Sequence, residues 1–79
     1  MTLENMNIAA EIKREAANTI ARIEHATGML DATMAGGIAE GFLIGLVCVN
    51  AITADAADEL EALFGDVTDQ KMISLRKNG

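Results

Sequence analysis

The chain has 79 residues and a net charge of −6, with 12 acidic and 6 basic side chains, no proline and one cysteine. Its length predicts a single domain spanning 1–79, and a lone cysteine excludes an internal disulfide framework. No cationic region followed by an apolar run opens the chain, so we expect no signal peptide and a cytoplasmic location. Only 3% of the residues are aromatic although 51% are hydrophobic, so the expected core is aliphatic.

Charged residues are segregated along the chain. The stretch from Glu24 to Asp69 carries nine acids and no lysine or arginine, because all six basic residues lie outside it. This segregation gives the segment a negative electrostatic field, which repels nucleic acid and anionic membranes and attracts basic partners. We therefore expect no direct nucleic-acid binding.

The composition predicts an all-α fold with three main helices. The first is expected over roughly 5–34, because apolar and small residues recur at heptad spacing. The members of this stripe are Ile8, Ala9, Ile12, Ala16, Thr19, Ile20, Ile23, Ala26, Leu30 and Thr33. The opposite face holds the small residues Ala10, Ala17, Ala21 and Gly28. This second face predicts contact with another subunit, and therefore a homodimer or larger assembly.

A chain reversal is predicted at Gly36-Gly37, followed by a second helix over 38–49 that Asn50 closes in the left-handed conformation. This helix is apolar on every side, with Phe42 in one stripe, and we expect it to be buried. Gly37, Gly41 and Gly45 recur at four-residue spacing, which predicts close packing against the first helix or, alternatively, helix contacts in a membrane. Glu40 and Asn50 within the apolar run argue against a membrane.

The third helix is expected to begin at a Thr53 cap and to end at Gly65. Its apolar sector consists of Ala56, Ala57, Leu60, Leu63 and Phe64. Opposite this sector lie the acids Asp55, Asp58, Glu59 and Glu61. We predict that they bind a partner; the alternative is a solvated surface that only keeps the protein soluble. Residues 66–79 are expected to form a short helix capped by Thr68, with 76–79 frayed.

Nothing in the sequence predicts catalysis, a metal or a cofactor. His25 and Cys48 are each the only residue of their kind. We expect His25 on the surface and Cys48 in the core, so they cannot form a nucleophile pair. One histidine and one cysteine do not make a zinc site, and the acids lack the spacing of a calcium loop.

Residues 42–64, FLIGLVCVNAITADAADELEALF, resemble the helical hairpin of many short phage and prophage accessory proteins. That resemblance implies a protein that binds and inhibits a host protein, and it transfers no site residue. We therefore expect a non-enzymatic module whose acidic helix engages a basic, nucleic-acid-binding host protein. The alternatives are an assembly subunit whose self-association is its function, and a small membrane-active peptide.

Overall fold

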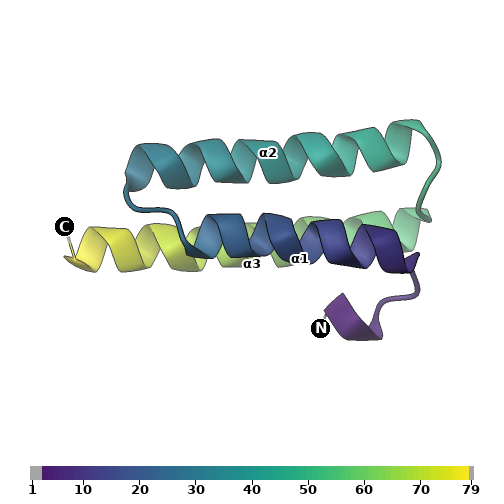
Figure 1. Cartoon of the computed structure of the whole chain (residues 1–79), viewed down its shortest axis with the longest axis horizontal. Helices are drawn as coiled ribbons and strands as arrows, with labels where there is room; N and C mark the ends of the chain where they lie inside the picture. Colours follow the sequence, from purple (N-terminus) through teal and green to yellow (C-terminus); the bar gives the residue numbers. More distant parts are fainter. Residues whose placement is uncertain (1–2, 79) are drawn as a thin grey trace.

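The computed structural model describes residues 3–78, and within this range it contains helices and no strand. A short 3-10 helix, η1 (Leu3–Asn5), precedes α1 (Ala10–Glu24), α2 (Met29–Cys48) and α3 (Ala54–Asn78). The three α-helices lie along the long axis of a body measuring 39 × 22 × 18 Å, and consecutive helices run in opposite directions (Figure 1). The predicted all-α fold with three main helices is confirmed.

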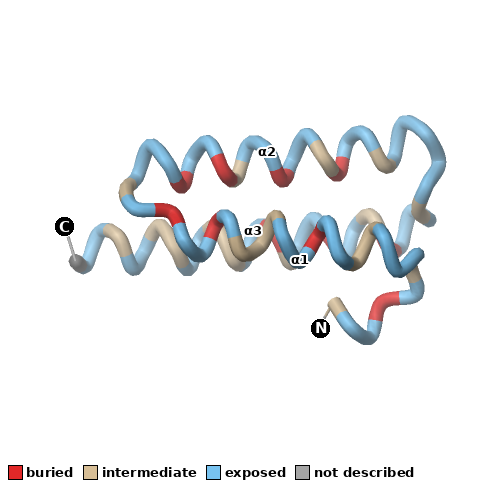
Figure 2. Tube along the Cα trace, in the orientation of Figure 1, coloured by how far each residue is buried: buried red, intermediate tan, exposed pale blue. Residues whose placement is uncertain are grey.

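The core lies where α1, α2 and α3 meet, and Ile23 and Leu60 are its largest fully buried side chains. Each helix contributes one row of buried residues, visible in Figure 2 as red segments facing the other helices. The core cluster consists of Met6, Ala16, Ile23, Ala35, Ala39, Leu43, Ala56, Leu60 and Phe64. The predicted apolar sector of the third helix is confirmed in position, because its central residue Leu60 is buried. The sector predicted for the first helix is confirmed within α1, where Ala16 and Ile23 are buried, but its members Leu30 and Thr33 lie exposed on α2.

The predicted long first helix is wrong, because α1 ends at Glu24 and the chain reverses over 25–28. Gly28 takes an extended conformation just before α2. The Asp31 side chain, in the first turn of α2, accepts a 3.0 Å hydrogen bond from the Thr27 backbone N–H. This carboxylate satisfies a backbone donor at the helix start, where the helix dipole also favours negative charge. The reversal is therefore encoded by Thr27, Gly28 and Asp31.

The predicted reversal at Gly36-Gly37 is also wrong, because both glycines lie inside α2 (Met29–Cys48). The end of α2 agrees with expectation, because Asn50 has a positive φ of 56°. Burial of α2 does not agree: its buried residues occupy one row, and the rest of the helix faces outward. Only α1 and α3 pack against α2, so only the side of α2 that faces them is buried.

The start of α3 is confirmed, since Thr53 Oγ1 accepts a 3.1 Å hydrogen bond from the Ala56 N–H. Its end is not, because α3 passes through Gly65 and continues to Asn78. Thr68 does not cap a new helix; its hydroxyl donates to the Phe64 backbone oxygen at 2.8 Å. Arg76 and Lys77, which lie in the segment expected to fray, belong to the last turn of α3, while Gly79 lies outside the described residues.

Candidate functional site

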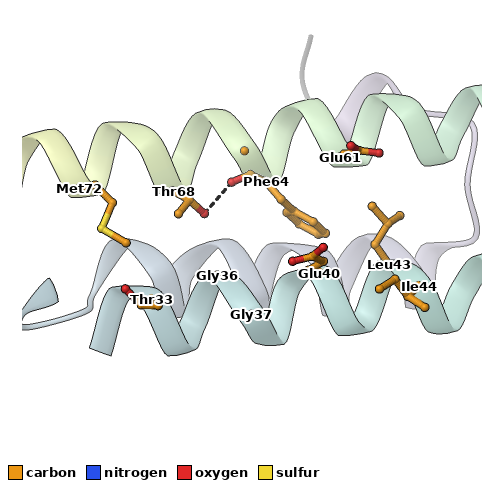
Figure 3. Close-up of a pocket in the computed structure, with 11 residues that line it drawn as sticks. Thr33, Gly36, Gly37, Glu40, Leu43, Ile44, Glu61, Phe64, Thr68 and Met72 are labelled. Atoms are coloured by element: carbon orange, nitrogen blue, oxygen red, sulfur yellow. Dashed lines mark hydrogen bonds between the residues drawn. The ribbon is translucent and has the colours of Figure 1, made fainter. Parts of the chain in front are cut away.

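A groove runs along the junction of α2 and α3. It consists of two adjoining hollows of about 590 and 490 Å³, both open to solvent. The hollows share Leu43, Ile44 and Glu61, so they form one continuous depression, which we call the α2–α3 groove. Figure 3 shows its first hollow between the two helices.

The floor of the groove is apolar. Leu43 of α2 and Phe64 of α3 are buried, and their side chains point into the space between the helices from opposite sides (Figure 3). Gly36, Gly37 and Gly65 line the same hollow, and the absence of side chains at these positions leaves room above the floor. The glycines thus leave a concave apolar surface at the junction of α2 and α3.

The charged residues that line the groove are all acidic. Glu40 and Glu61 line the first hollow, and Asp58 joins Glu61 in the second. All three are exposed. Two of the lysines are held elsewhere, because Lys13 donates to the Glu4 backbone oxygen at 3.0 Å and Lys71 to the Glu24 backbone oxygen at 2.7 Å. An apolar floor with a negative border is chemically suited to a basic amphipathic segment.

The four acids predicted to bind a partner are exposed, but the structure divides them. Asp58 and Glu61 line the groove, whereas Asp55 and Glu59 line neither hollow. Glu40, which also lines the groove, was not predicted as a site residue. Its signal was that it is the only charged residue in the apolar run after Gly37.

The residues predicted for packing have different environments. Phe42 contacts the core, with its ring centroid 6.4 Å from that of Phe64 and the rings tilted by 46°. Ala17 is exposed and Ala21 is half-buried. The predicted close packing of three glycines against the first helix is wrong, because a Cβ added at any of them would meet nothing within 4 Å. These glycines are Gly37, Gly41 and Gly45.

The side of α2 that points away from the core is exposed and carries no charge. We call it the outer face of α2. Its members are Leu30, Met34, Gly37, Ile38, Gly41, Ile44, Gly45 and Cys48. Leu30 is 75% exposed and Met34 60%, although a bulky apolar side chain is usually buried in a small domain. Contiguous apolar patches of this kind are typical of surfaces that bind another molecule.

His25 and Cys48 do not form a pair in the core. His25 is exposed as expected, but the expectation of a buried Cys48 is wrong, because Cys48 lies on the outer face of α2. Among the described residues, no group of three or more histidine, cysteine or acidic side chains is placed to hold a metal ion.

Helix α2, with 20 residues, is long and apolar enough to cross a membrane by length and composition, and 22% of the segment is buried in the bundle. An apolar helix of this length can cross a membrane or pack against other helices, so its length and composition do not distinguish these two roles. Comparison with protein-family models, curated proteins and solved structures finds no match to the chain.

Proposed function

We propose that this protein is a non-enzymatic protein-binding module that holds a basic amphipathic segment of a partner protein in the α2–α3 groove. The observation that carries the proposal is the apolar floor formed by Leu43 and Phe64 beneath a border whose charged residues are all acidic. Apolar contacts would supply most of the affinity, and the carboxylates would select a cationic partner and speed its approach.

The chemistry of the groove matches a helix with an apolar stripe flanked by lysine or arginine. Glu40 on α2 and Asp58 and Glu61 on α3 would contact the basic flanks, while the apolar stripe covers the floor. Basic helices of this kind are common in nucleic-acid-binding proteins, where the same side chains contact phosphates. A module that covers these basic side chains would keep them from phosphates and would act as a stoichiometric inhibitor or regulator in the cytoplasm. The resemblance to phage accessory proteins also implies an inhibitor.

A synthetic peptide tests the proposal directly. The probe is a fluorescent amphipathic helix with leucine at every third or fourth position and lysine elsewhere, and its glutamate-substituted counterpart is the negative probe. Binding is measured by fluorescence anisotropy at about 50 mM and about 500 mM salt. We expect the lysine peptide to bind, more tightly at low salt, and the glutamate peptide not to bind.

Two matched charge-reversal variants distinguish the contribution of the groove to peptide binding from the contribution of the net charge. Asp58→Lys/Glu61→Lys alters the groove, whereas Asp55→Lys/Glu59→Lys changes the net charge equally on the same helix but outside it. All four side chains are exposed, so both variants should keep the fold. We expect the first to weaken peptide binding at least about tenfold, and the second to act mainly on the association rate. Equal effects of the two variants, or none, would refute the groove as the binding site.

A further inference from the structure

We infer that the outer face of α2 binds a second copy of this chain, with the two α2 helices antiparallel and related by a two-fold axis at Gly41. The inference goes beyond the proposed function, because it concerns contact between two copies of the chain. The outer face and the α2–α3 groove share Gly37, Ile44 and Cys48. Three observations carry it: the exposure of bulky apolar side chains there, the arrangement of residues about Gly41, and the distribution of charge along the chain.

The outer face is self-complementary about Gly41. Gly37 and Gly45 lie four residues to either side of it, and Ile38 and Ile44 lie three residues to either side. A two-fold interface brings the same patch of both subunits together, so a surface with internal symmetry of this kind meets its requirement. In an antiparallel pair centred on Gly41, Ile38 lies beside the partner's Gly45 and Ile44 beside the partner's Gly37. Each bulky side chain then faces a position that has no side chain.

Space for this contact is present on the surface. A Cβ added at Gly37, Gly41 or Gly45 would meet nothing within 4 Å, so no other part of the same chain fills the space above these glycines. Ile38 is 45% exposed and Ile44 55%, and both would lose water-accessible apolar area in the pair. The face is uncharged, which matters for a chain of net charge −6, because most other surfaces would bring carboxylates of two copies together.

Charge along the bundle selects the antiparallel arrangement. The acids Asp55, Asp58, Glu59 and Glu61 lie within the first eight residues of α3. Asp58 and Glu61 line one hollow with Val47 and Cys48 at the C-terminal end of α2. The basic residues Lys71, Arg76 and Lys77 lie in the C-terminal part of α3, which is at the end of the bundle where α2 begins (Figure 1). Antiparallel pairing sets the basic end of each chain toward the acidic end of its partner, whereas parallel pairing sets like charges together.

Lipid is a poorer occupant of this face than a second copy. Burial in a bilayer would surround α2, including Glu40 at the border of the outer face, and a carboxylate at that depth is strongly disfavoured. It would also require α1 and α3 to leave the buried row of α2, with Ala35, Ala39 and Leu43. A second copy covers only the exposed side and leaves the bundle intact.

Disulfide cross-linking tests both the contact and its direction. Met34 and Cys48 lie seven residues to either side of Gly41, so an antiparallel pair sets position 34 beside the partner's Cys48. Within one helix these positions are about 21 Å apart and cannot bond. Under mild oxidation at micromolar concentration, Met34→Cys should give a covalent dimer on a non-reducing gel. The natural chain and Met34→Cys/Cys48→Ser, each with one thiol, should give no more dimer than the exposed α3 control Ile73→Cys/Cys48→Ser.

A second measurement tests Gly41 itself. Gly41→Leu should abolish the dimer seen in sedimentation equilibrium while circular dichroism stays helical, because the position is open within the chain. The matched control Gly65→Leu, on α3, should keep the dimer. If Gly41→Leu loses its helicity, the cross-linking of Met34→Cys alone decides whether the two α2 helices form an antiparallel pair.

Three results would overturn the inference. If the natural chain gave more cross-linked dimer through Cys48 than the Ile73→Cys/Cys48→Ser control, the pair would be parallel. A monomer at all concentrations would leave the face without a second copy. Flotation of the chain with phosphatidylcholine–phosphatidylglycerol vesicles, with no dimer in solution, would assign the face to lipid.

Discussion

Gly36 of α2 lies against Thr68 of α3, so that a Cβ added at Gly36 would be 3.3 Å from Thr68 Cγ2. The threonine side chain is held in place, because its hydroxyl donates to the Phe64 backbone oxygen at 2.8 Å. A contact of 3.3 Å is tighter than an ordinary van der Waals contact, so the missing side chain at Gly36 permits the close approach of α2 and α3 beside the groove.

Substitutions at Gly36 should reveal this contact in thermal or urea unfolding. Gly36→Ala gains helix propensity of up to about 1 kcal/mol but must displace Thr68, so we expect little net change in the free energy of unfolding. Gly36→Leu should lower that free energy by about 1–3 kcal/mol, because the larger side chain overpacks the α2–α3 contact.

Thr68→Ser provides the control, since it removes Cγ2 and keeps the hydroxyl. The double variant Gly36→Ala/Thr68→Ser should be more stable than the sum of its single effects predicts, as neighbours that share a contact are not additive. Strict additivity would show that Thr68 does not limit the space at Gly36.

Gly65 lies inside α3 and has no neighbour within 4 Å of an added Cβ. Gly65→Ala should therefore raise the free energy of unfolding by up to about 1 kcal/mol, because glycine weakens a helix interior. For a domain of this size the melting temperature should rise by about 4–8 °C. A fall in melting temperature would contradict a continuous α3 and indicate instead a helix that ends at this glycine.

Asn50 reverses the chain after α2 with a φ of 56°. Asn50→Ala should lower the free energy of unfolding by about 1 kcal/mol, because a Cβ without a compensating polar group is unfavourable in the left-handed region. Asn50→Gly, which accepts this conformation, should match or exceed the natural chain in chemical denaturation. Equal stability of the alanine and glycine variants would refute a conformational role for this position.

The local signals in the sequence determined the helical class, the start of α3 and the end of α2. Thr53 as a cap and Asn50 as a left-handed residue act through their own backbone and nearest neighbours, so sequence alone suffices for them. The apolar rows of α1 and α3 were predictable for a similar reason: amphipathic periodicity fixes which side of a helix can be buried. Exposure of the acids of α3 followed from the same periodicity.

Glycines were misinterpreted because their effect depends on what surrounds them. Gly36 and Gly65 were expected to end helices, yet both are helical, since packing between α2 and α3 outweighs the cost of glycine in each. Gly28 was assigned to a helix face but starts α2 in an extended conformation, and the deciding hydrogen bond comes from Asp31.

The groove was decided by tertiary structure. Glu40 belongs to one helix and Glu61 to another, and only the antiparallel packing of α2 on α3 sets both along Leu43 and Phe64. The outer face of α2 was likewise decided by how many helices cover it. An evenly apolar helix has no periodicity that predicts which side is buried. The sequence therefore determined only that α2 is apolar enough to be buried, and the packing of α1 and α3 decided which side remains exposed.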